Sequence, residues 1–130
     1  MKYLTAREAL ELAEFACQGQ RVTVRDLGLL GSALHRPQQY TFGIEAYPDL
    51  FEKAAALLQS LTANHPLLDG NKRTAWMCTV VFLDFNGVDM ADVDQDAAYD
   101  LVIAIASGKT EDVTVIAARL RALHKGADSM

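Results

Sequence analysis

The sequence has only two cysteines and three prolines in 130 residues. Cys17 and Cys78 lie far apart, each inside an apolar pattern of helical period, and neither has a second cysteine or a histidine at zinc-ligand spacing. We therefore expect no structural zinc site and no disulfide framework, and we predict two buried thiols in a reducing compartment. The chain is 51% hydrophobic, which is enough apolar material for a compact fold without cross-links.

Long apolar runs and a basic surplus are also missing. No run reaches the length of a membrane span, and Glu8 and Glu11 interrupt the N-terminal segment where a signal sequence would be apolar. The net charge of −5 argues against direct binding of nucleic acid, which requires a basic face. We expect a cytoplasmic protein with no membrane partner. Neither the Walker A pattern nor the signature of eukaryote-type kinases occurs, so ordinary P-loop and kinase folds are excluded.

Most of the chain has apolar residues at helical spacing, and its length suits one domain with one core. Thr5 and Glu8 form a capping-box pattern, and Asn86-Gly87 is a typical left-handed helix end. Residues 74–85 are apolar on nearly every side, which predicts a buried central helix. We predict an all-α, single-domain bundle of about six helices over residues 1–126, with a frayed tail at 127–130; the helices are expected at about 5–17, 26–36, 48–64, 70–85, 94–107 and 110–125.

Residues 37–47 have no helical period. Tyr40, Phe42 and Ile44 alternate with polar or small residues, which predicts an extended edge. Two interpretations stay open: a flap that binds a peptide by strand addition, or a loop whose aromatic side chains cover the core.

Titratable and polar side chains are most concentrated in residues 65–74, His-Pro-Leu-Leu-Asp-Gly-Asn-Lys-Arg-Thr. Pro66 disfavours helix at His65, so one helix should end there, and Asp69 is placed to cap the next. The residues from Gly70 to Arg73 should then form an opening turn whose unpaired amides attract anions. With the Lys72 and Arg73 cations and the His65 imidazole nearby, this pattern is typical of phosphoryl or nucleotidyl transfer.

A purely structural interpretation competes with this one. Asp69 could serve only as a helix cap, Lys72 and Arg73 could form a solvated first turn, and His65 could simply end a helix. Each residue alone fits that interpretation well, whereas the complete set at this spacing favours a functional motif.

This stretch resembles the core motif of the Fic fold, His-Pro-Phe-x-Asp/Glu-Gly-Asn-Gly-Arg-x-x-Arg. Three positions depart from it: Leu67 replaces Phe, Lys72 replaces Gly, and Trp76 replaces the last Arg. The Lys and the missing second Arg are features of the Doc ("death on curing") toxins, and the likeness extends over roughly residues 2–124. Leu67 is expected to fill the core in place of Phe, and Trp76 and Met77 are expected to be core residues. The positions that match the motif are His65, Pro66, Asp69, Gly70, Asn71 and Arg73.

The resemblance implies a Fic/Doc helical bundle with a short extended flap, and the toxin of a type II toxin–antitoxin system. Such toxins transfer the γ-phosphate of ATP to a threonine of elongation factor Tu and thereby block translation. By the same resemblance, His65 is the general base and Asp69 holds Mg²⁺. Phosphate would be bound by Gly70, Asn71, Lys72 and Arg73, and the flap that docks the target would comprise Tyr40, Thr41, Phe42 and Gly43.

The resemblance also implies a partner. No inhibitory Ser/Thr-x-x-x-Glu-Gly/Asn motif occurs in the chain, so we expect restraint in trans by a Phd-like antitoxin whose disordered tail folds on binding. Two other functions remain open: transfer of AMP or another nucleotidyl group to a protein hydroxyl, and a non-enzymatic module that keeps the fold for binding.

Overall fold

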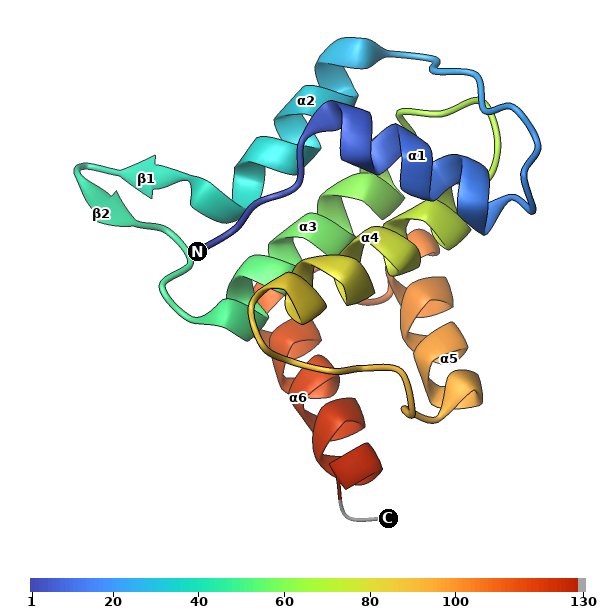
Figure 1. The fold of residues 1–130 in the computed structure, drawn as a ribbon. Helices are drawn as coiled ribbons and strands as arrows, with labels where there is room; N and C mark the ends of the chain where they lie inside the picture. The colour runs from blue at the N-terminus through green and yellow to red at the C-terminus, as the bar shows by residue number, and fades with distance from the viewer. Residues whose placement is uncertain (129–130) are drawn as a thin grey trace.

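The computed structural model describes residues 1–128 and confirms the all-α prediction (Figure 1). Within these residues, helices supply most of the core, loops add Leu4, Leu67, Met90 and Val93, and the only strands form one short hairpin. The elements in chain order are α1 (Ala6–Ala16), α2 (Leu27–His35), the 3-10 turn η1 (Arg36–Gln38), β1 (Tyr40–Thr41), β2 (Ile44–Glu45), α3 (Leu50–Asn64), α4 (Asn71–Phe85), α5 (Gln95–Ala106) and α6 (Val113–Asp128).

The central helix is α3, which corrects the prediction that residues 74–85 would occupy the centre. Helix α3 packs against α2, α4, α5 and α6, and even its polar Lys53, Ser60 and Thr62 are buried. Helix α4 packs against α1, α3 and α5 and leaves Trp76 and Val80 half-buried. Helix α4 is apolar on nearly every side, yet it lies at the border of the core. Its composition could not predict this position, because tertiary contacts decide which apolar face is covered.

The helix boundaries agree closely with the capping and stop signals in the sequence. Thr5 and Glu8 form the predicted capping box of α1, and Gly87 follows α4 in the left-handed conformation at φ +92°. One start differs: Pro48 precedes α3, and Asp49 caps it by accepting a hydrogen bond from the amide of Glu52 at 3.2 Å.

The C-terminal helix is longer than predicted. Helix α6 continues to Asp128, so residues 127 and 128 of the expected tail are helical. The remainder of the predicted tail, 129–130, lies outside the described residues. No helix in the described part of the chain has the length and apolar character needed to cross a membrane.

The segment 37–47 folds into η1 and a two-residue hairpin. Tyr40 pairs with Glu45 and Thr41 with Ile44, and the turn places Phe42 and Gly43 at φ +52° and +77°, the combination of a type I′ turn. The Phe42 side chain is 99% exposed, and Tyr40 is also exposed. The interpretation in which these aromatic side chains cover the core is therefore wrong.

Candidate functional site

The motif loop joins α3 to α4. Helix α3 ends at Asn64, as the following Pro66 led us to expect, and His65 adopts a left-handed conformation at φ +48° and ψ +57° that the sequence did not predict. A non-glycine residue in this region is uncommon, and such backbone conformations persist only where neighbouring contacts hold them. The imidazole of His65 belongs to an exposed residue, so incoming groups can reach it.

The segment before α2 holds the loop from outside. The amide of Arg25 donates to the carbonyl oxygen of Pro66 at 2.8 Å, and the amide of Leu68 donates to Thr23 at 3.0 Å. Val24 and Leu67 form an antiparallel bridge between the same two segments. The motif loop is thus one side of a small ladder, which fixes its path between the helices.

Arg25 also acts through its side chain. Its Nε donates to the carbonyl oxygen of His65 at 2.7 Å, and its Nη2 donates to that of Asn64 at 2.8 Å. These carbonyls belong to the C-terminal end of α3, where partners are missing and a cation is favoured. Sequence reasoning did not assign this role to Arg25, since only the fold brings it to the motif.

Asn71 closes the loop from inside. Its side-chain oxygen accepts from the amide of Leu67, and its side-chain amide donates to the carbonyl of Leu67, both at 2.9 Å. The Leu67 side chain is 1% exposed, so it fills the core as predicted. The structure thus commits the Asn71 side chain to the loop, whereas the sequence predicted a phosphate contact for this residue.

Gly70 is required by both conformation and space. It precedes α4 at φ +79°, and a Cβ atom placed on it would lie 2.6 Å from the Sγ of Cys17. Cys17 is therefore close to the motif and only half-buried, which corrects the prediction of two buried thiols; Cys78 is fully buried.

Asp69 does not cap α4, contrary to the prediction. Gly70 occupies the capping position without any side-chain hydrogen bond to the first turn, and the Asp69 carboxylate instead accepts from the amide of Gly70 at 2.8 Å. The Gly70 amide is therefore engaged. The amides of Asn71, Lys72 and Arg73, in the uncapped first turn, keep the anion-binding capacity of a helix N-terminus.

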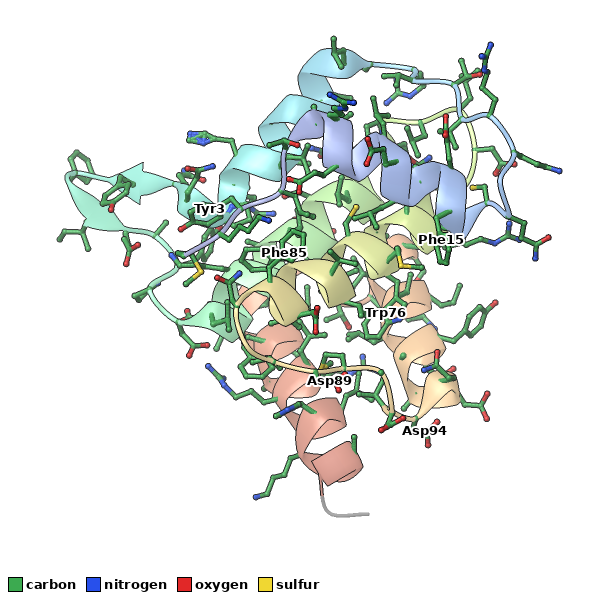
Figure 2. All side chains as sticks on the ribbon, in the orientation of Figure 1. Tyr3, Phe15, Trp76, Phe85, Asp89 and Asp94 are labelled. Carbon is green, nitrogen blue, oxygen red and sulfur yellow. The ribbon has the colours of Figure 1, made fainter. Side chains whose placement is uncertain are left out.

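The two cations of this turn are available. Lys72 and Arg73 are exposed, and neither forms an ion pair within residues 1–128. Both line a cavity of about 390 Å³ that extends between α4 and α5. Trp76, which lies on α4 (Figure 2), packs against the core as expected, but it is only half-buried and also lines this cavity.

The oxygen donors near the motif suit the implied Mg²⁺ only as part of a nucleotide site. Among residues 1–128, no three His, Cys, Asp or Glu side chains gather at one place where they could hold a metal ion. Magnesium in nucleotide sites commonly uses only one or two carboxylates together with substrate phosphates and water. A single exposed carboxylate, Asp69, fits that manner of binding and does not fit a metal site made by protein alone.

The structure does not bring the hairpin to the motif loop. The hairpin precedes the first residue of α3 and the motif follows its last, and Figure 1 shows them at opposite ends of this helix. A helix of 15 residues is about 22 Å long.

The buried ammonium group of Lys53 fixes the hairpin base by donating to the carbonyl of Tyr47 at 2.6 Å and to the carboxylate of Glu45 at 3.2 Å.

Known proteins resemble this chain over nearly its whole length. The sequence pattern of the Fic/DOC family matches residues 3–83. "Toxin Doc" of Mycolicibacterium smegmatis (strain ATCC 700084 / mc(2)155) is 46% identical over 129 residues, which cover 98% of each chain. "Protein kinase doc" of Escherichia phage P1 is 31% identical over 130 residues, which cover 98% of this chain and 100% of the relative.

Proposed function

The chain belongs to the Fic/DOC family, and on that premise we propose that it is a toxin that phosphorylates a threonine of elongation factor Tu at the expense of ATP. The observation that carries this proposal is the uncapped N-terminus of α4 with two cations, seven and eight positions after an exposed histidine, that form no ion pair within residues 1–128. An amide-rich turn, two cations and a base are the groups that phosphoryl transfer requires of a protein.

His65 is proposed as the general base. It accepts the proton of the target hydroxyl as the oxygen attacks the γ-phosphorus, and the bond to the ADP leaving group breaks. The ladder between residues 23–26 and 66–68, together with the Arg25 side chain, holds the backbone that carries the imidazole. Orientation of this kind contributes to rate because the reacting groups need little further ordering.

The first turn of α4 is proposed to bind the phosphoryl oxygens. The amides of Asn71, Lys72 and Arg73 and the two cationic side chains stabilise the negative charge on the group being transferred. Asp69 would hold Mg²⁺, which neutralises phosphate charge when bound. The Asn71 side chain acts indirectly, because its hydrogen bonds to Leu67 set the distance between the loop and the turn.

Two substitutions favour a kinase over an AMP transferase. Lys72 adds a charge and fills space where the Fic pattern has glycine, and Trp76 removes the second arginine of that pattern. The name of the phage relative, "Protein kinase doc", supports the same choice. Transfer of AMP to a protein hydroxyl is the second candidate, because the shared motif residues would serve it equally well.

The hairpin is proposed as a target-docking flap, and an antitoxin as a restraint in trans. Phe42 is almost entirely exposed, and both strands of the hairpin have a free edge within residues 1–128. An extended segment of about seven residues would be needed to span the length of α3 from the flap to His65. The relative named as a toxin supports the proposal of a Phd-like antitoxin.

The test uses elongation factor Tu and ATP labelled separately at the α and γ positions. We expect transfer of the γ label by the wild-type chain and no transfer by His65→Ala, whose circular dichroism should remain that of a folded helical protein. Transfer of the α label would favour the AMP transferase, and transfer of neither label would contradict both enzymatic functions. Growth arrest on expression, lost in His65→Ala, is the cellular counterpart.

A further inference from the structure

The cavity between α4 and α5 has one charged end and one aromatic end. Lys72 and Arg73 lie in the first turn of α4. Trp76, labelled in Figure 2, follows one helical turn later. Side chains on a helix lean towards its N-terminus, so the Trp76 indole covers the surface next to the two cations. Helix α5 supplies Tyr99, which is 65% exposed and lines the same cavity.

The remaining walls suit a flat apolar ring with a polar edge. Ala98 and Val102 are buried small or branched residues that form the α5 side of the cavity. Gln95 donates from Nε2 to the carbonyl of Val93 at 3.2 Å, and its Oε1 has no protein partner among the described residues. The cavity volume of about 390 Å³ lies within the range of small-molecule sites.

From these observations we infer that the cavity between α4 and α5 binds the base of a purine nucleotide, with Trp76 and Tyr99 as its aromatic contacts. The inference rests on the proposed function, since the phosphates of the same nucleotide lie at the α4 turn. The charge pattern selects this occupant: a nucleotide is a polyanion joined to an aromatic ring, and it matches two cations followed by an aromatic wall.

A larger cavity, of about 660 Å³, matches a nucleotide less well. It lies between α5 and α6, and Asp92 and Asp94 stand on its wall with the single cation Arg119. Two carboxylates repel phosphate, and none of the motif residues reaches this cavity. The charge of the residues that line each cavity therefore identifies the nucleotide site better than the cavity volume does.

The position of Trp76 also explains a departure from the Fic pattern. An arginine at this position would add a third cation to the phosphate region, whereas an indole offers a face for stacking. With an indole in place of a guanidinium, this side of the cavity is suited to binding a base rather than a phosphate.

The test compares ATP with tripolyphosphate, which has the phosphates and no base. Trp76 is the only tryptophan of the chain, so its fluorescence reports on the cavity directly. We expect ATP to quench this fluorescence and to bind at least about tenfold more tightly than tripolyphosphate in calorimetry, the scale of one base–aromatic stack.

Variants locate the contact. Tyr99→Ala should weaken ATP binding by about fivefold or more, again the scale of a lost stack, and leave tripolyphosphate binding unchanged. Trp76→Phe should keep most of the ATP affinity, whereas Trp76→Leu should lose it. Phe15→Ala, at an exposed aromatic side chain of α1 outside the cavity, is the matched control and should change neither affinity.

The outcomes separate the two proposals. Equal affinities for ATP and tripolyphosphate, or an unchanged ATP affinity in Tyr99→Ala, would overturn the base site and leave the phosphate turn intact. Failure of both ligands to bind the wild-type chain would overturn the base site and the proposed function together.

Discussion

The guanidinium group of Arg25 donates from Nε to the carbonyl oxygen of His65 at 2.7 Å, across 40 positions of sequence. The same group reaches Asn64, so one side chain binds both the last residue of α3 and the left-handed residue that carries the imidazole. The conformation of His65 therefore depends on Arg25, a residue of the segment before α2 that lies far from His65 in the sequence.

Arg25→Ala is expected to lower the turnover number of phosphate transfer more than it lowers stability. Loss of two hydrogen bonds from a solvent-exposed residue should reduce the free energy of unfolding by about 1 kcal/mol. Misplacement of the base should reduce kcat by about tenfold to a hundredfold, with the KM for ATP unchanged. Arg25→Lys should recover part of kcat. An unchanged kcat in Arg25→Ala would contradict the positioning role.

Gly70→Ala is expected to disrupt the motif. The new Cβ would lie 2.6 Å from the Sγ of Cys17, and the backbone at φ +79° disfavours any side chain. We expect a loss of about 1–3 kcal/mol in the free energy of unfolding, measured in urea, together with loss of transfer. Adding Cys17→Ala should recover the part due to the close contact and leave the part due to the backbone. Full recovery would show that the left-handed conformation costs nothing here.

Lys53→Met is expected to loosen the hairpin. The Lys53 side chain is only 3% exposed, and its loss leaves Glu45 and the Tyr47 carbonyl without their donor. Because the Glu45 side chain is partly in water, we expect a loss of about 2 kcal/mol in the free energy of unfolding, less than the roughly 3–5 kcal/mol for breaking a fully buried ion pair. The KM for the protein target should rise while ATP affinity stays constant. Lys109→Met, at an exposed lysine, is the control that should change neither.

Phe42→Asn tests the flap as a docking surface. Asparagine tolerates the left-handed conformation of the turn, and the Phe42 side chain buries almost nothing, so the melting temperature should not change. We expect the KM for the protein target to rise by about fivefold or more, the loss of one apolar anchor. The prediction fails if target phosphorylation is as efficient as in the wild-type chain at low target concentration.

The two thiols are expected to differ in their response to alkaline pH. Burial raises the pKa of Cys78 from 9.0 to about 12, so the folded state retains a proton that the unfolded state loses. The contribution to stability is complete below pH 9 and declines as pH rises towards 12. Cys78→Val should make the free energy of unfolding less dependent on pH in this window. A maleimide at pH 7 should label Cys17 alone until denaturant is added.

The sequence was sufficient for the elements whose signals are local. The capping box of Thr5 and Glu8, the stop at Gly87 and the effect of Pro66 on His65 each depend on a few adjacent residues, and each occurs as predicted. The apolar character of Leu67 was likewise enough to place it in the core. Signals of this kind can be interpreted without knowing which other elements pack against the segment.

Tertiary structure decided everything that depends on a neighbour. The apolar composition of α4 could not reveal that α3 takes the centre, because coverage of a face depends on the other helices. Asp69 was a plausible cap, but the left-handed Gly70 occupies that position, and Trp76 lines a cavity because α5 does not cover it completely. Arg25 reaches His65 only because the chain returns to the loop after 40 residues. Local sequence thus determined the helices and the identity of the motif, whereas long-range packing determined which of its groups are held, which are engaged and which are free to bind.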